Sequence, residues 1–227
     1  MGNYKYILFD LDGTLTNPYE GITRSVQYAL NYFGINDVPQ PELKKFIGPP
    51  LKASFMEYYG FDDAKAELAV EKYRERFRDT GIFENEVYDG VEHLLRALKD
   101  RGLVLAIASS KPTEFVERIL KHFHIYDYFV NITGSFMDGR RTDKYEVIAA
   151  AMEALEVVDK AQVLMVGDRH HDVDGAVRAG VDCVGAAFGY GGRAELEQAK
   201  ATAVVDSVAA LECYILEHAQ ADGAAGR

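Results

Sequence analysis

Cysteine is scarce in this chain of 227 residues, which contains only Cys183 and Cys213. Their spacing fits no metal-binding pattern, and two cysteines are too few for a disulfide-rich scaffold. We therefore interpret both as ordinary packed or surface side chains, and we expect a reducing, cytoplasmic environment. The first residues also lack the long apolar core of a signal peptide, which favours the same location.

Positive charge and long apolar runs are scarce as well. The chain has 25 lysines and arginines against 36 aspartates and glutamates, which gives a formal net charge of −11. Because phosphate backbones and anionic lipids repel such a protein, we expect neither a nucleic-acid partner nor a membrane partner. No apolar run approaches the roughly 20 residues that span a bilayer. An anionic small-molecule substrate would need a metal ion or local basic side chains to offset the same repulsion.

Short apolar runs alternate with amphipathic segments over most of the chain. The apolar runs are typical of buried strands, and the segments between them have helical periodicity. This alternation predicts the α/β class, with a doubly wound, Rossmann-like parallel sheet that has helices on both faces. The expected strands are residues 4–10, 103–109, 128–134, 162–168, the start of 182–189, and 203–205, and the expected helices are 90–102, 113–123, 144–155, 172–180 and 208–218.

The segment 17–83 has only the helical period. Apolar residues such as Ile22, Val26 and Leu30 share one face of its first helix. We therefore expect an inserted all-helical domain at 17–83, a core domain made of 1–16 and 84–220, and a disordered tail at 221–227.

Acidic and polar side chains follow the expected strands at their carboxyl ends. In a doubly wound sheet, ligands bind outside these ends, so we expect the side chains to meet at one edge. Several carboxylates there would repel one another without a cation, and oxygen ligands at this density suit Mg²⁺. The residues concerned are Asp10 and Asp12 in FDLDGTL, Ser109, Lys144, Asp168 and Asp172.

These stretches resemble a known family. DLDGT, a strand-end serine, a lysine and GDRHHD are similar, in this order, to the four motifs of the haloacid dehalogenase superfamily of phosphatases. The resemblance covers nearly the whole chain, and the helical block resembles that superfamily's alpha-helical cap. IGPPL, SSKP and GDRHHDVDGA most resemble phosphoglycolate phosphatase-like members. One departure is Tyr145, which stands where the family often has proline after its lysine.

The resemblance implies a phosphatase that acts on small phosphate monoesters. Asp10 would attack phosphorus and form an aspartyl-phosphate. Asp12 would protonate the leaving oxygen and later take a proton from water. Ser109 and Lys144 would bind the phosphoryl oxygens. Mg²⁺ would contact Asp10, the main-chain carbonyl of Asp12, Asp168 and Asp172.

Further residues are predicted to bind the substrate. Gly13 would let the chain turn away after Asp12, and Thr14 would form a hydrogen bond near Asp12. In the helical domain, a cation would pair with the substrate's second charged group. The predicted set is Gly13, Thr14, Ser110, Gly48, Arg24 and Lys52.

Several alternatives remain open at this point. Phosphoglycolate is the leading prediction for the substrate, and a nucleoside monophosphate, as for a 5'-nucleotidase, is the alternative. A phosphomutase shares the nucleophile, but its similar members carry a cap-entry histidine where this chain has Glu20. A receiver domain is about half as long, and a non-catalytic binder has no use for Asp12. His170 and His171 could bind a transition metal. The glycine-rich stretch GYGGRAEL is interpreted as a loop before the last helix. The protein could be a monomer or a homodimer.

Overall fold

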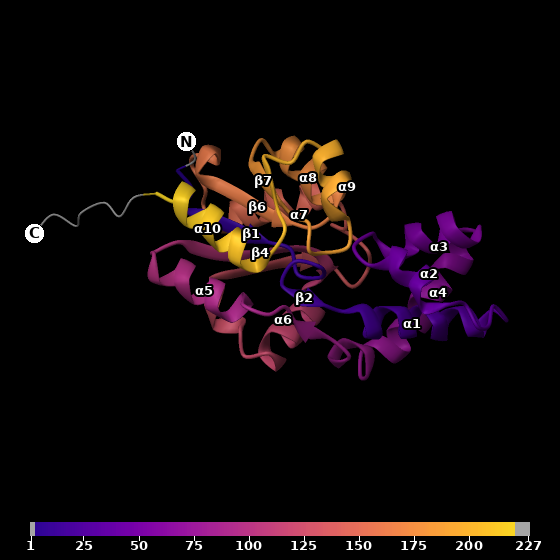
Figure 1. Ribbon diagram of the computed structural model, residues 1–227. Coiled ribbons are helices and arrows are strands. Elements are labelled where there is room, and N and C mark those ends of the chain that lie inside the picture. The colour runs from indigo at the N-terminus through magenta and orange to yellow at the C-terminus, as the bar shows by residue number, and fades with distance from the viewer. Residues whose placement is uncertain (1–2, 221–227) are drawn as a thin grey trace, which may run out of the picture. The chain divides into compact units, whose positions relative to one another are not determined.

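The computed structural model describes residues 3–220 and divides the chain into two compact units. One unit comprises Met1–Leu15 and Val87–Arg227, and the other comprises Thr16–Glu86. Figure 1 follows the chain through both. The predicted tail at 221–227 lies outside the described residues.

A six-stranded parallel sheet forms the centre of the first unit. Its strand order is β5-β4-β1-β6-β7-β8, so the first strand lies in the middle and the order reverses beside it. The predicted α/β class with a doubly wound sheet is confirmed. The strands are β1 (Tyr6–Phe9), β4 (Val104–Pro112), β5 (Asn131–Ser135), β6 (Val163–Gly167), β7 (Asp182–Ala186) and β8 (Ala203–Val205).

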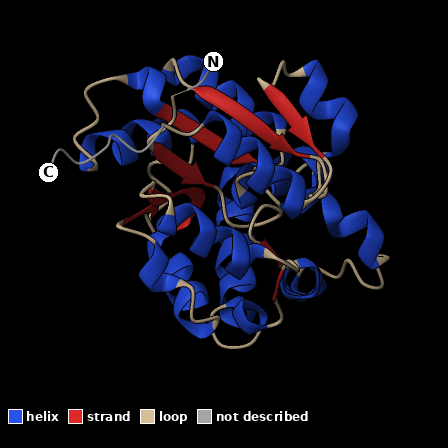
Figure 2. Cartoon of the chain, turned by 60° about the vertical axis from the view of Figure 1, so that its left-hand side comes forward, coloured by secondary structure: helices blue, strands red, loops and turns tan. Residues whose placement is uncertain are grey.

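Helices cover both faces of this sheet (Figures 1 and 2). One layer contains α7, α8 and α9, and the opposite layer contains α5, α6 and α10. Because both faces are covered, the central strands β1 and β6 contain no charged residue, whereas β5 and the end of β4 are partly polar. The helices are α5 (Val91–Asp100), α6 (Thr113–His122), α7 (Lys144–Ala154), α8 (His170–Ala179), α9 (Gly192–Gln198) and α10 (Val208–His218).

Burial explains why these segments fold as they do. Ile7, Leu8 and Phe9 of β1 are completely buried, and each such side chain contributes about 1.5–3 kcal/mol relative to exposure. In α5, the buried residues Val91, Leu94, Leu95 and Leu98 recur at the spacing of one helical face. The core therefore lies on both sides of the sheet and holds β1 rigidly at its centre.

The second unit is helical. The strands β2 (Thr16–Asn17) and β3 (Glu86–Val87) pair where the chain enters and leaves it. Phe46, Phe55 and Phe61 pack as an aromatic cluster in its interior. Its helices are α1 (Tyr19–Tyr32), α2 (Gln40–Leu43), α3 (Leu51–Tyr59) and α4 (Asp63–Phe77), with 3₁₀ turns at Lys44–Phe46 and Gly81–Phe83.

The largest differences from the sequence prediction concern three elements. β4 continues to Pro112, three residues beyond the expected end at 109. β5 begins at Asn131 because Tyr126–Tyr128 form a 3₁₀ turn. GYGGRAEL is only partly a loop, because α9 begins at Gly192. Within residues 3–220, no helix is both long and apolar enough to cross a membrane.

Candidate active site

The central strand brings the polar residues together at its carboxyl end. β1 pairs with β4 on one side and with β6 on the other, with Phe9 opposite both Ile107 and Val166. Asp10, Ser109 and Asp168 follow these three positions by one or two residues. Because the strand order reverses at β1, this end of the sheet is the place where doubly wound folds bind ligands.

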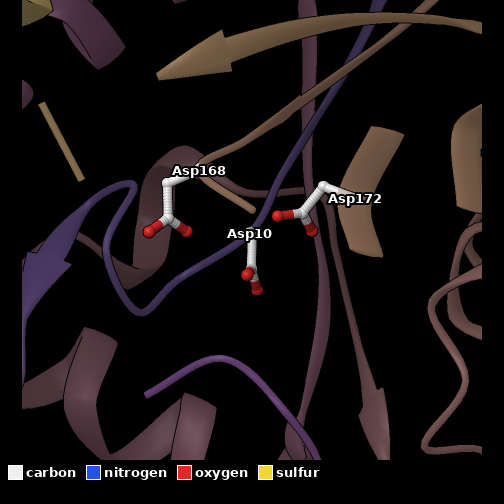
Figure 3. A group of neighbouring side chains, drawn as sticks. All are labelled: Asp10, Asp168 and Asp172. Atoms are coloured by element: carbon white, nitrogen blue, oxygen red, sulfur yellow. The ribbon is translucent and has the colours of Figure 1, made fainter. Parts of the chain in front are cut away.

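Three buried carboxylates meet there. One ligand oxygen from each of Asp10, Asp168 and Asp172 lies within 4.8 Å of the others. Figure 3 shows the three side chains turned toward the same small region. Their relative exposures are 6%, 0% and 1%. This separation is short enough for a single small cation to contact all three.

In two of these acids, Asp168 and Asp172, one carboxylate oxygen accepts a hydrogen bond from a main-chain N–H group. The N–H of Tyr190 donates to Oδ2 of Asp168 at 2.7 Å, and the N–H of Arg169 donates to Oδ2 of Asp172 at 3.0 Å. Oδ1 of Asp168 has no hydrogen-bond partner among residues 3–220. Because an unsatisfied buried carboxylate oxygen is costly, its orientation fits a bound cation.

Lys144 is the cation that the chain itself supplies to this cluster. Its Nζ lies 3.0 Å from Oδ1 of Asp10 and 2.7 Å from Oδ1 of Asp172, and it donates to the carbonyl of Ala108 at 3.3 Å. Burial tends to lower the pKa of Lys144, but the two carboxylates outweigh it and raise the pKa above its ordinary value. Lys144 is therefore charged, and the structure brings it to the edge where it was expected.

Burial raises the pKa values of Asp168 and Asp172, whereas it tends to lower the pKa of Lys144. Burial, together with the charges of Asp172 and Asp10, raises the pKa of Asp168 well above its ordinary range. The pKa of Asp172 is also raised, mainly by burial, although Lys144 opposes the shift. A divalent cation would relieve this repulsion and keep both groups ionised.

Asp12 is turned toward a different lysine. Nζ of Lys111 lies 2.8 Å from Oδ1 and 2.6 Å from Oδ2 of Asp12. Burial raises the pKa of Asp12, and Lys111 partly offsets this. The Asp12 side chain is thus separate from the three clustered acids, and its predicted metal contact through the main-chain carbonyl stays a prediction. Lys111 is a residue that the sequence analysis did not assign.

The segment after Asp12 turns as predicted, but one contact differs. Gly13 has φ +82°, a conformation that side chains rarely adopt, and a Cβ there would lie 2.1 Å from Asp168. Oγ1 of Thr14 is buried and has no hydrogen-bond partner in the described part of the chain. The Thr14 hydroxyl therefore makes no hydrogen bond near Asp12, whereas the Thr14 main-chain N–H donates to the carbonyl of Leu11 at 3.3 Å. The substrate contact of Thr14 stays a prediction. Ser109 is buried within β4, three residues before its end at Pro112, and Ser110 is half-buried beside it.

Glu195 is a second residue that sequence reasoning missed. Its Oε1 accepts hydrogen bonds from the His170 N–H at 2.8 Å and from Nε of Arg169 at 2.9 Å, and it lies 2.9 Å from Nδ1 of His170. Burial tends to raise the pKa of Glu195, but these donors lower it to about 2. Glu195 therefore ties α9 to the segment between Asp168 and Asp172. No local pattern could have shown this, because the partners lie 25 residues apart.

The histidine pair does not join the acidic cluster. Nδ1 of His170 contacts Glu195, and burial and the neighbouring cations lower the pKa of His171 to about 4. Among the described residues, the group that could hold a metal ion contains only aspartates. The transition-metal alternative is therefore unsupported.

The predicted residues of the helical unit are engaged within that unit. Arg24 pairs with Glu20 at 2.6 Å and with Glu84 at 2.9 Å. Lys52 pairs with Asp63 and Glu67 at 2.8 and 2.9 Å. Gly48, with φ +105°, lies in the break before α3. Their substrate contacts stay predictions.

Comparison with known proteins decides the family. The model of the haloacid dehalogenase-like hydrolase family matches residues 7–186, which include all four motifs. The chain belongs to this family. The prediction made from the motifs is confirmed, and the chain is a hydrolase of the phosphatase type.

Relatives and solved structures agree with this assignment. The chain is 48% identical to a 5'-nucleotidase of Pseudomonas aeruginosa over 95% of its length and 97% of the relative's. It is similar to the crystal structure of a predicted phosphatase from Clostridium acetobutylicum, with a TM-score of 0.92, 49% identity and coverage of 95% and 99%. It is also 39% identical to the tyrosine-protein kinase PtkA of Mycobacterium tuberculosis, over 91% of this chain and 69% of the relative.

The Glu195 contacts predict a pH-dependent stabilisation. The pKa of Glu195 falls from its ordinary 4.5 to about 2 in the folded protein. Its contribution is therefore complete above about pH 5.5 and is lost as the pH falls through 4.5 toward 2. We expect Glu195→Gln to lower the free energy of unfolding by about 1–3 kcal/mol at pH 7, with a smaller difference at pH 4.

Urea unfolding at several pH values measures this difference. Glu153→Gln, at an exposed position of α7, is the matched control and should show no such trend. A Glu195→Gln effect of the same size at pH 7 and pH 4 would contradict the assignment.

Proposed function

We propose that this protein is a Mg²⁺-dependent phosphatase that hydrolyses nucleoside 5'-monophosphates through an aspartyl-phosphate on Asp10. The observation that carries the proposal is the placement of Asp10 beside two other buried aspartates and the charged Lys144. A carboxylate nucleophile needs neighbouring cations when it approaches an anionic phosphate. The acidic net charge of the chain makes such local compensation necessary.

Two acids divide the proposed chemistry. An Asp10 oxygen forms a bond to phosphorus while the bond to the ester oxygen breaks, and the leaving oxygen takes a proton from Asp12. Water then attacks phosphorus and gives its proton to Asp12, and the bond to Asp10 breaks. Inorganic phosphate leaves and both carboxylates return to their starting state.

Cations and donors at the sheet edge would stabilise the charge that spreads over the phosphoryl oxygens. Lys144 supplies one positive charge, and Ser109 supplies a hydroxyl donor from the neighbouring strand. Asp10, Asp168 and Asp172 fit a divalent cation because their oxygens converge and Asp168 Oδ1 is unsatisfied. When bound, Mg²⁺ would supply charge neutralisation for the phosphate.

A nucleotide substrate is favoured over phosphoglycolate by two observations. The relative with 48% identity over nearly the whole chain is named a 5'-nucleotidase. Phosphoglycolate would need a cation for its carboxylate, and Arg24 and Lys52 already pair with acidic residues of their own unit. Neither observation requires a change of the core chemistry, which handles only the phosphoryl group.

A panel of phosphate esters tests the substrate class. We expect phosphate release from nucleoside 5'-monophosphates to have a kcat/KM at least about tenfold above that from phosphoglycolate, which corresponds to about 1.4 kcal/mol of discrimination. The panel contains purine and pyrimidine 5'-monophosphates, the 3'-isomers, phosphoglycolate and pyrophosphate. Preference for phosphoglycolate would overturn the substrate class but not the phosphatase activity.

The nucleophile assignment predicts a severe loss in Asp10→Asn. We expect kcat to fall by at least about 10³-fold, because the amide cannot form the phospho-enzyme. Acid quenching after mixing with radioactively labelled nucleotide should leave label on wild-type protein and none on this variant. Asp100→Asn, at an exposed site in α5, is the control. Label on Asp12 instead of Asp10 would reverse the two roles.

The metal assignment predicts direct binding of Mg²⁺. Titration calorimetry should detect one site in the wild-type protein, and Asp168→Asn should weaken binding by about tenfold or more because one of few protein ligands is lost. Asp174→Asn changes an exposed acid on the same helix as Asp172 and should leave binding unchanged. Equal affinities in the wild type and Asp168→Asn would contradict the site.

A further inference from the structure

Lys111 has no role in the proposed chemistry, yet it is buried beside one of the two reacting acids. Its Nζ contacts both carboxylate oxygens of Asp12, at 2.8 and 2.6 Å. The Lys111 and Asp12 side chains are only 8% and 11% exposed. The two residues lie 99 positions apart in the sequence, so the pair exists only because β1 and β4 are neighbours.

Stability alone does not account for this pair. Removing a lysine and an aspartate from water costs several kcal/mol, and their attraction often does no more than offset that cost. An apolar pair of similar volume would hold β1 and β4 together at least as well. A buried ion pair that includes a reacting carboxylate, Asp12, therefore points to a role of Lys111 in the chemistry.

The local geometry of β4 fixes the position of Lys111. The register between β4 and β5 shifts between Ala108 and Pro112, and such irregularities re-aim side chains next to active sites. Gly134 of β5 lies directly against this part of β4, where a Cβ would approach the Lys111 carbonyl to 2.4 Å. The main chain of Lys111 is therefore fixed by close packing as well as by its side-chain contacts.

Two lysines thus serve different acids at the same sheet edge. Lys144 faces Asp10 and Asp172, whereas Lys111 faces Asp12. The charge of Lys144 also acts on the Asp12 carboxylate, but more weakly than that of Lys111. Lys111 keeps the Asp12 carboxylate on its own side of the site.

We propose that Lys111 is a positioning residue that holds Asp12 facing the leaving-group oxygen. This inference rests on the proposed function, in which Asp12 gives its proton to that oxygen as the bond to phosphorus breaks. Lys111 itself neither gains nor loses a proton. Its contribution should therefore depend on how strongly the leaving oxygen needs a proton.

Two substrates that differ in the basicity of the leaving oxygen distinguish the positioning of Asp12 from a role of Lys111 in phosphate binding. The 5'-oxygen of a nucleotide leaves as a strongly basic alkoxide unless it is protonated, whereas p-nitrophenolate is a stable anion. Positioned acid–base groups contribute about 10²–10⁴-fold to such reactions. Both esters give the same phospho-enzyme, and Asp12 also takes the proton of water in its hydrolysis, so the rate to compare is that of leaving-group release in a single turnover. We expect Lys111→Met to lower this rate by about 100-fold for AMP and by less than about fivefold for p-nitrophenyl phosphate.

The variants are chosen so that each result is informative. Lys111→Arg keeps a cation beside Asp12 and should recover most of the AMP activity. Asp12→Asn should show the same difference between the two esters, and adding Lys111→Met to it should cause little further loss. Lys99→Met, on an exposed part of α5 where Lys99 donates to the Asp127 carbonyl, is the matched control and should behave like the wild type. Thermal unfolding of each variant shows that it is folded.

The outcomes distinguish the two proposals. An equal loss for both esters in Lys111→Met, while Asp12→Asn affects mainly AMP, would overturn the positioning role and leave the proposed function intact. If the loss of rate in the double variant equals the product of the losses in the two single variants, the residues act independently, and this would also overturn the positioning role. If Asp12→Asn slows leaving-group release equally for both esters, the acid role of Asp12 is wrong and the inference about Lys111 fails with it.

Discussion

Buried negative charge at the carboxyl end of β1 is the constraint on which the rest of the site depends. Asp10, Asp12, Asp168 and Asp172 are each less than a tenth exposed, and they come from two separate segments of the chain. Carboxylates so placed repel one another and lose hydration, which raises the pKa of three of them. The protein offsets this with two lysines, Lys111 and Lys144, and with main-chain donors.

The surrounding fold holds these opposing charges in place. Ile7, Leu8 and Phe9 of β1 are fully buried between β4 and β6, and Asp10 follows them directly. Main-chain N–H groups of Arg169 and Tyr190 fix one oxygen each of two acids, and Glu195 fixes the segment between those acids. The unsatisfied oxygen of Asp168 is thereby directed inward, and this preorganisation is what a cation site and a phosphoryl-transfer site both require.

Much of this could be predicted from particular residues. The apolar run before Asp10 predicts a strand buried on both faces, and alternation with amphipathic segments predicts a parallel sheet. Together they predict that Asp10, Ser109 and Asp168 meet, because parallel strands share one carboxyl edge. The Thr14 hydroxyl has no hydrogen-bond partner among the described residues, because neighbours in the sequence do not settle which partner a side chain meets. The helical start at Gly192 was missed because glycine-rich segments are normally loops.

The sequence by itself determined the fold class, the family and the acids at the strand ends, since periodicity and motif order are local properties of the chain. Only the tertiary structure decided which lysine forms an ion pair with which acid. Lys111 lies two residues after Ser109, but its partner Asp12 lies in the turn after β1, and the register between β4 and β5 shifts at this part of β4. Glu195 likewise acquires its role through α9 packing against the Asp168 segment. Such pairings depend on the contacts between strands and helices, and residue type and spacing along the chain do not encode them individually.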